Sequence, residues 1–319
     1  MIRFFLARVS QFSKLGLDLL NRIRFARISA VATKQNQVGF YYFPLAAASW
    51  LRDGMGNETA VTKGFNPSHL LLESTDENRS QPVTLILLQN ESKDVALELS
   101  QRAGENKTIE VIVPQPTFAL RRTFNELGIA RKEKITVMTR GIESRTNSSD
   151  QEFSVAKLMP SQIHSYVALN LEEFQHQDQN VELQLVQNRL NGNQTDVFQV
   201  SVSDPDHRET AIGNFAIHYL DRGADSIVKI ASQLNAIREE QLDADSFSLE
   251  QLRSIAFIFD LLIHSDFRNR GIATETLNRI DEIARQNDSL ALGVLATPAN
   301  EPFYKLLGFD AVSSFERWS

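Results

Sequence analysis

The residues most able to bind a ligand form a short loop at positions 268–273, where two arginines alternate with small or polar residues. An apolar run over residues 255–263 precedes this loop and predicts a buried strand. Residues 274–287 follow it with the spacing of an amphipathic helix. The N-terminus of a helix presents backbone N–H groups without intrahelical partners and the positive end of the helix dipole. A strand, a tight loop and a helix in this order therefore predict a site for phosphate.

The side chains of the loop fit that prediction. Gly271 and Ala273 leave space for an anion to reach the backbone, and Arg268 and Arg270 can add charge-assisted hydrogen bonds. An ordinary strand-to-helix turn with two solvated arginines would show the same pattern. The loop alone does not decide between these two interpretations.

Tyr304 is the second candidate for chemistry. It lies in the stretch Phe303-Tyr304-Lys305-Leu306-Leu307-Gly308-Phe309, which predicts a short helix that ends at a glycine before a final strand. The alternative interpretation is a core tyrosine on a short helix.

The elements that must position these residues occupy the second part of the chain. A polar stretch centred on residues 147–150 predicts a linker, and a fresh succession of elements begins after it. Hydrophobic periodicity predicts strands at 153–158, 197–202, 212–220, 255–263 and 290–295, and helices at 163–174, 181–190, 274–287 and 303–307.

This order of elements, with its two motifs, resembles the GNAT superfamily of N-acetyltransferases. Residues 258–267 are similar to that family's fourth strand and its exit, and the Arg-x-x-Gly-x-Ala pattern of residues 268–273 is similar to its acetyl-CoA pyrophosphate loop. Residues 303–309 are similar to its final helix and turn. The similarity covers residues 153–319 and implies an α/β (α+β) fold with a mixed, mostly antiparallel sheet flanked by helices.

The resemblance also implies a site for acetyl-CoA as co-substrate, without a metal. The cofactor would lie where the fourth and fifth strands splay apart. The residues expected to contact it are Leu261, Leu262, Ile263, Arg268, Asn269, Arg270, Gly271, Ile272 and Ala273. Tyr304 matches the family tyrosine that protonates the departing thiolate.

The identity of the general base is left undecided by the sequence. Phe257 and Phe259 stand near the place where some family members carry a glutamate, which leaves Asp260, His264 or a water relay. Side chains alternate along a strand, so Asp260 is expected on the face opposite to Phe259. Thr297 also differs from the family pattern, because many members have at this position an asparagine that contacts the cofactor.

The first part of the chain shows a weaker echo of the second. Strands are predicted at 83–88, 108–113 and 134–139 and helices at 92–103 and 118–127. Phe124 then corresponds to Tyr304 without its hydroxyl, and residues 89–92 replace the phosphate loop with no glycine and an added acid. We therefore expect two such domains in tandem, at 1–145 and 152–319, with the chemistry only in the second; an unrelated α/β domain is the alternative for 1–145.

The composition narrows the function further. The 319 residues carry a net charge of −7, contain no cysteine, and hold six histidines without metal-ligand spacing. No apolar run reaches the length of a membrane span, and no basic patch interleaved with aromatics indicates a nucleic-acid partner. The oligomeric state is undetermined.

The first 34 residues form a basic segment with seven Lys or Arg and one acid. It predicts either the first helix of the fold or a mitochondrial transit peptide. We expect a cytoplasmic protein in the first case and a mitochondrial one in the second.

The predicted function is transfer of an acetyl group to a primary amine of a small molecule or peptide. Seven acids between residues 221 and 250 would attract a cationic amine, or else form a solvated helix face. The alternatives are an acyltransferase for a longer acyl-CoA and a non-catalytic acyl-CoA sensor or scaffold.

Overall fold

The computed structural model describes only part of the chain, namely residues 44–55, 59–63, 69–74, 83–87, 92–104, 109–114, 116–142, 153–173, 178–203, 209–220, 222 and 253–319. The basic segment 1–34, the linker at 147–150, the loop at 89–91 and nearly all of the acidic insert 221–250 lie outside these residues. The expectations for those segments therefore remain expectations.

The described elements of the first half begin with a helix and three strands, after which helices and strands alternate as periodicity predicts. They are α2 (Pro44–Met55), β1 (Thr59–Lys63), β2 (His69–Ser74), β3 (Val83–Leu87), α3 (Ser92–Gly104), β4 (Ile109–Val113), α4 (Phe118–Glu126) and β5 (Arg131–Gly141). Thr117 caps α4, because its hydroxyl accepts a hydrogen bond from the Leu120 N–H at 3.2 Å.

The second half repeats and extends this pattern. Its elements are β6 (Phe153–Lys157), η1 (Pro160–Gln162), α5 (Ile163–Glu173), α6 (Gln179–Asn191), β7 (Thr195–Ser203), β8 (Glu209–Tyr219), β9 (Ile255–Ile263), η3 (Ser265–Phe267), α9 (Ile272–Gln286), β10 (Ala291–Ala296), α10 (Glu301–Leu306) and β11 (Asp310–Trp318). Asp178 caps α6 by accepting a hydrogen bond from the Asn180 N–H at 2.7 Å.

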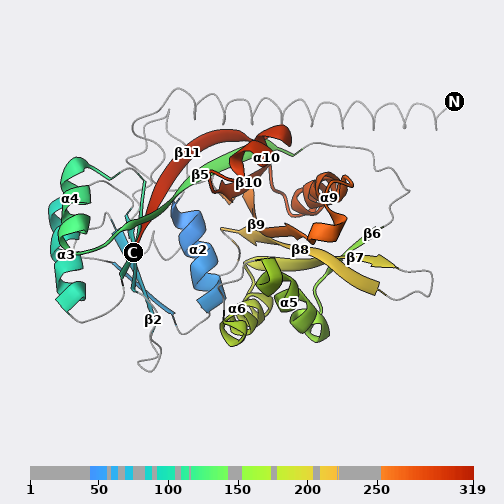
Figure 1. Cartoon of the computed structure of the whole chain (residues 1–319), viewed down its shortest axis with the longest axis horizontal. Coiled ribbons are helices and arrows are strands. Elements are labelled where there is room, and N and C mark those ends of the chain that lie inside the picture. The colour runs from blue at the N-terminus through green and yellow to red at the C-terminus, as the bar shows by residue number, and fades with distance from the viewer. Residues whose placement is uncertain are drawn as a thin grey trace, which may run out of the picture.

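All described strands join one sheet of eleven, in the order β1-β2-β3-β4-β11-β5-β10-β9-β8-β7-β6. Two neighbouring pairs are parallel, β3 with β4 and β9 with β10, and the other pairs are antiparallel. Figure 1 shows α5 and α6 on one side of β7, β8 and β9, with α9 on the other. The predicted fold class, a mixed and mostly antiparallel sheet flanked by helices, is confirmed.

The two halves exchange their last strands. β5, from the first half, lies between β10 and β11 and is antiparallel to both. β11, from the second half, lies between β4 and β5. Figure 1 shows these two long strands running together between the halves. Because each exchanged strand carries the ladder hydrogen bonds of its neighbours, neither half completes its sheet without the other.

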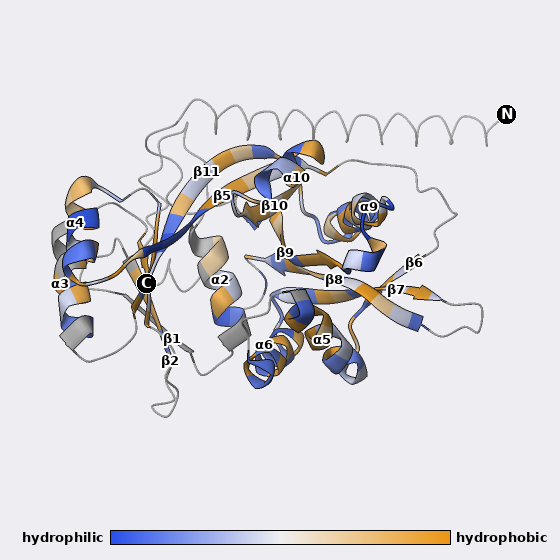
Figure 2. Ribbon diagram, in the orientation of Figure 1, coloured by the Kyte–Doolittle hydropathy of each residue, from blue (hydrophilic) through white to orange (hydrophobic). Residues whose placement is uncertain are grey.

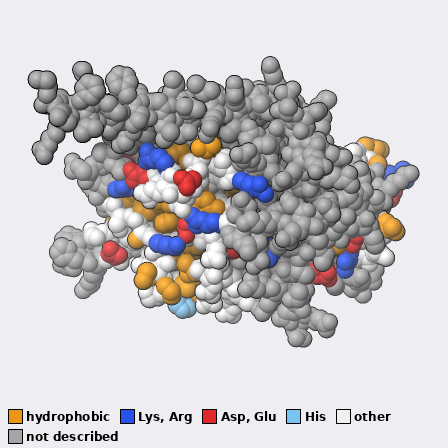
Figure 3. Space-filling view, turned by 180° about the vertical axis from the view of Figure 1, so that it is seen from behind, with side chains coloured by type: hydrophobic (Ala, Val, Ile, Leu, Met, Phe, Trp, Pro, Cys, Tyr) orange, Lys and Arg blue, Asp and Glu red, His pale blue; other side chains and the backbone are white. Residues whose placement is uncertain are grey.

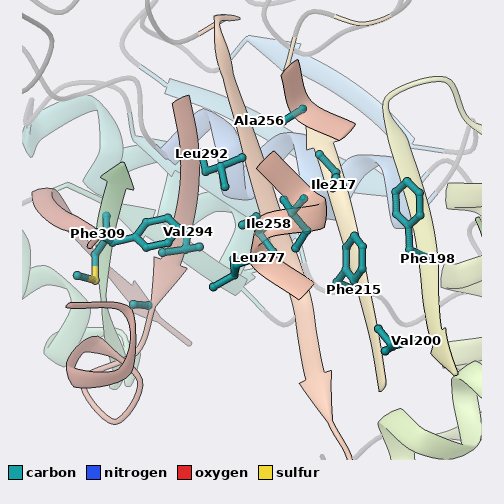
Figure 4. Close-up of a cluster of buried hydrophobic side chains, with 14 of the residues drawn as sticks. Phe198, Val200, Phe215, Ile217, Ala256, Ile258, Leu277, Leu292, Val294 and Phe309 are labelled. Atoms are coloured by element: carbon teal, nitrogen blue, oxygen red, sulfur yellow. The ribbon is translucent and has the colours of Figure 1, made fainter. Parts of the chain in front are cut away.

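Apolar side chains pack on both faces of the sheet. One core cluster joins Phe215, Ile217 and Ile258 of the sheet to Leu277 and Ile280 of α9. Figure 4 labels several of its members, from Phe198 on β7 to Phe309 beside α10. In Figure 2 the central strands are largely apolar, whereas the helices carry apolar and hydrophilic residues side by side.

A second cluster fills the opposite face, where α5, α6 and α2 meet the sheet. It contains Trp50, Tyr166, Val167 and Val186, with Phe259 packed against it. Helix α2 belongs to the first half, so this cluster also joins the two halves. One face of β9 therefore packs against α9, and the other packs against α2, α5 and α6.

Candidate active site

Strands β9 and β10 run together only over their first part. Their parallel register extends from Ile255–Ala291 to Ile258–Val294. β9 then continues to Ile263 along β8, while β10 continues to Ala296 along β5. The strands therefore diverge after Ile258, and the predicted cofactor residues Leu261, Leu262 and Ile263 lie on β9 beyond that point, where Leu262 and Ile263 pair with β8.

A β-bulge interrupts β9 where the strands diverge. Ala216 of β8 faces Phe259 and Asn214 faces Leu262, so Asp260 and Leu261 together oppose a single residue of β8. Asp260 accommodates this with φ of 52°, in the left-handed region. Leu261 packs against the core on the α9 face.

The bulge overturns one expectation about side-chain direction. Phe259 stacks on Trp50 with ring centroids 4.1 Å apart, on the face covered by α2, α5 and α6. The Asp260 carboxylate contacts Tyr166 Oη and Arg189 Nη1, both at 3.4 Å, and these residues belong to α5 and α6. The prediction that Asp260 faces away from Phe259 is wrong, because the extra residue of a bulge breaks the alternation of side chains.

The electrostatics around Asp260 reflect this packing. Burial raises the pKa of the Asp260 carboxyl above its ordinary range, and the Arg189 guanidinium opposes that shift. Arg189 also lies 3.5 Å above the Trp50 ring centroid. Trp50 is thus enclosed between Phe259 and Arg189, and it links α2 to the bulge.

The loop at 268–273 connects β9 to α9 through η3. Arg268 Nε donates to the Ile263 carbonyl at 2.8 Å, and Arg270 Nη2 donates to the Asp266 carbonyl at the same distance. The Arg270 guanidinium also lies 5.1 Å from the Phe267 ring centroid. Both arginines are exposed, so each is oriented by a backbone contact while its guanidinium stays at the surface of the loop.

The backbone of the loop is shaped for the start of a helix. Asn269 and Gly271 have φ of 62° and 79°. A Cβ added at Gly271 would meet nothing within 4 Å, so the space beside it is open. α9 begins at Ile272, two residues earlier than predicted, and its first backbone bond runs from the Glu275 N–H to the Gly271 carbonyl. Ile272 and Ala273 therefore lie in the first turn, whose N–H groups have no intrahelical acceptor.

Tyr304 lies on α10, partly buried against the α9-side core. Its ring meets Phe303 and Phe309 edge-on, at centroid distances of 5.3 and 5.5 Å. Burial and the Asp260 carboxylate raise the pKa of Tyr304 to about 12. The phenol therefore stays protonated at neutral pH, and Asp260 is close enough to influence it.

Comparison with known proteins bears on the second half. Residues 246–309 match the model of the acetyltransferase (GNAT) family. The chain carries a GNAT domain. No curated protein matches the chain in sequence.

Solved structures extend the likeness to most of the chain. A GCN5-related N-acetyltransferase from Kribbella flavida is 9% identical, with a TM-score of 0.53 over 88% of this chain and 96% of the other. A conserved protein of unknown function from Staphylococcus epidermidis is 10% identical, with a TM-score of 0.52 over 82% and 93%. A tandem GNAT protein from the clavulanic acid biosynthesis pathway is also 10% identical, with a TM-score of 0.50 over 82% and 83%. These likenesses concern the fold, and they support the tandem arrangement.

The first half repeats the end of the GNAT domain without its hydroxyl. The Ile129 N–H donates to the Phe124 carbonyl at 2.8 Å, as the Phe309 N–H donates to the Tyr304 carbonyl at 3.0 Å. The glycines that precede these donors, Gly128 and Gly308, both have positive φ. Phe124 therefore occupies the place of Tyr304, as the sequence predicts.

Other residues weighed from sequence have evident structural partners. His264 Nε2 lies 3.3 Å from Glu172 Oε1, and His264 Nδ1 accepts from the Asp266 N–H at 3.3 Å. The Thr297 carbonyl accepts from the Asn300 and Glu301 N–H groups at the start of α10. Sequence reasoning missed the contributions of Trp50 and of Thr136 and Arg140 on β5, because no local pattern links these residues to the GNAT domain.

The described residues contain no group of three or more His, Asp or Glu that could hold a metal, and none of their helices is long and apolar enough to cross a membrane. Figure 3 shows one face of the molecule, on which the described Lys, Arg, Asp and Glu side chains lie among one another rather than in separate fields of one sign. No single-signed surface therefore stands out on the described part of that face.

Proposed function

We propose that the second half transfers an acetyl group from acetyl-CoA to a primary amine of a small molecule or peptide. The observation that carries this proposal is the divergence of β9 from β10 directly before the loop at the start of α9. This arrangement offers an open strand for a thioester and a helix N-terminus for a pyrophosphate within one continuous segment. The working site belongs to residues 152–319, and residues 1–145 form a supporting copy.

The loop residues divide the binding of the cofactor between backbone and side chains. N–H groups of Gly271, Ile272 and Ala273 would bind the pyrophosphate, with Arg268, Asn269 and Arg270 around it. Backbone groups of Leu261, Leu262 and Ile263, beyond the divergence, would bind the pantetheine arm and the thioester carbonyl. A fixed N–H donor there stabilises the negative charge that the carbonyl oxygen gains in the transition state.

The reaction needs one bond to form and one to break. The amine nitrogen attacks the thioester carbon, the carbon–sulfur bond breaks, and the sulfur leaves as a thiolate. Tyr304 supplies the proton that converts this thiolate to the thiol of CoA, because a phenol with a pKa of about 12 still carries its proton at neutral pH.

The incoming amine must also lose a proton. Asp260 lies on the face covered by α5 and α6, and burial raises the pKa of its carboxyl, which makes it a better proton acceptor than an exposed aspartate. A water relay is the alternative, because Arg189 and Tyr166 already contact this carboxylate.

Isothermal titration with acetyl-CoA, followed by an assay of free CoA release over a panel of amines, tests the proposal. We expect binding to the full chain and turnover with at least one primary amine. Binding without turnover on every amine would favour an acyl-CoA sensor, and turnover only with longer acyl-CoA would replace acetyl by a longer group. Absence of binding would overturn the proposal.

A further inference from the structure

The helix that carries Tyr304 is too short to be stable by itself. α10 spans the six residues Glu301–Leu306, and isolated helices of that length are unstable in water. Its place in the molecule must therefore come from tertiary contacts. Two of these contacts come from β5, a strand of the other half of the chain.

The first contact holds the beginning of α10. Thr136 Oγ1 on β5 donates a hydrogen bond to Glu301 Oε1 in the first turn. Thr136 is buried, and this bond is the main reason why the pKa of Glu301 is lowered from its ordinary value. A carboxylate in the first turn also interacts favourably with the helix dipole.

The second contact holds the end of α10. Arg140, on the same face of β5 as Thr136, donates from Nη1 to the Leu307 carbonyl at 3.2 Å. Its Nη2 donates to Asp281 Oδ2 of α9 at 2.7 Å, and both side chains are buried. Arg140 therefore joins α10, the helix of Tyr304, to α9, the helix that begins at Ile272.

The first half has the corresponding contacts, in which strand β11 of the second half contacts helix α4 of the first. Glu316 on β11 pairs with Arg121 of α4 at 2.9 Å, and Trp318 packs against Phe124 with centroids 4.9 Å apart. Glu316 lies 180 residues after Thr136, and Glu301 lies 180 residues after Arg121. Each exchanged strand thus holds the last helix of the other half, but only α10 carries a tyrosine.

We propose that Thr136 and Arg140 are positioning residues that fix Tyr304 for proton donation, so that the first half is a working part of the acyltransfer site. This inference rests on the proposed function of Tyr304. Proton transfer to a leaving sulfur depends steeply on the position of the donor, and a loosened α10 would misplace the hydroxyl.

A pair of matched variants tests the inference. Thr136→Val removes the hydroxyl that holds Glu301, whereas Thr136→Ser keeps it. Thr139→Val is the control, because the buried Thr139 hydroxyl on the same strand has no hydrogen-bond partner among the described residues. Hydrogen exchange of peptides covering residues 298–309 reports on α10, and peptides covering α9 report on general destabilisation.

We expect Thr136→Val to speed amide exchange in α10 by about fivefold, as the loss of one hydrogen bond predicts. We also expect kcat to fall by about tenfold, with an unchanged KM for acetyl-CoA. Thr136→Ser and Thr139→Val should keep the wild-type exchange rate in α10 and the wild-type kcat. Equal exchange in α10, or equal losses of kcat, in the two valine variants would overturn the inference. If the wild-type chain transfers no acyl group, the exchange data still decide whether β5 holds α10, and only the proposed function is lost.

Discussion

Arg140 of the first half and Asp281 of the second form a buried ion pair, with 2.7 Å between Nη2 and Oδ2. β5 carries this arginine into the GNAT domain, where it lies between α9 and α10. The pair connects the first half of the chain to both helices of the candidate site. The first half therefore contributes a strand and a buried side chain to the GNAT domain.

Removal of Arg140 should destabilise the whole chain. Arg140→Met leaves the Asp281 carboxylate buried without this cation, at a cost of about 3–5 kcal/mol. Urea denaturation gives the free energy of unfolding. Arg122→Met is the control, because Arg122 also has an acidic partner at 2.7 Å, Glu126, but both side chains are largely exposed. That change should cost less than about 1 kcal/mol, and similar losses in the two variants would contradict the role assigned to Arg140.

Tyr304→Phe should lower kcat by about 100-fold or more, the usual effect of removing a general acid. The affinity for acetyl-CoA should stay close to that of the wild type, because the proposed pyrophosphate loop is untouched. Assays of CoA release measure kcat, and isothermal titration measures the affinity for acetyl-CoA. Tyr219→Phe serves as the control, since Tyr219 is a buried tyrosine away from the proposed site, and wild-type turnover in the Tyr304 variant would remove this residue from the mechanism.

Gly271→Ala should weaken acetyl-CoA binding by about tenfold or more, because a methyl group would enter the space where the pyrophosphate meets the backbone. The positive φ also adds backbone strain of about 1–2 kcal/mol. Gly128→Ala provides an equal strain, since Gly128 has φ of 72° and nothing within 4 Å of an added Cβ. Titration should show a changed Kd only for Gly271→Ala, and a parallel change in both variants would indicate a general effect of strain.

Residues 152–319 should not fold alone into a soluble monomer. Without β5, β10 and β11 lose the strand between them and expose unpaired edges. Co-expression with residues 1–145 should restore a soluble 1:1 complex, as size-exclusion chromatography would reveal. A monomeric 152–319 fragment with a cooperative melting transition would show that the exchanged strand is dispensable.

His218 should make the protein less stable in acid. It is fully buried, with Ser49 Oγ 2.7 Å from Nε2 and Thr195 Oγ1 2.8 Å from Nδ1, and burial lowers its pKa to about 3. A depressed folded pKa stabilises the folded state fully above the unfolded value of about 6.5, and this contribution is lost as the pH falls toward 3.

The expected slope for this single proton is about 1.4 kcal/mol per pH unit within that window. Urea titrations between pH 7 and pH 4 measure it, and His218→Gln should show a correspondingly shallower dependence. An NMR titration in which the His218 ring becomes charged near pH 6.5 would contradict the assignment of a buried, neutral imidazole.

Much of this architecture could be predicted before any coordinates. An apolar run predicted β9, hydrophobic periodicity predicted β10 and the helix after the loop at 268–273, and a similarity of short segments matched Phe124 to Tyr304. These features are local, because the period of apolar side chains and the positions of glycine depend only on neighbouring residues.

The tertiary structure alone decided how those elements combine. Any strand offers the same backbone N–H and C=O groups to any partner, so no local pattern reveals that β5 inserts between β10 and β11. The bulge that turns Asp260 toward α5 and α6 likewise depends on the register with β8. The sequence therefore determined which residues can do chemistry, whereas long-range strand pairing decided that Thr136 and Arg140, far away in the chain, hold the helix of Tyr304 in place.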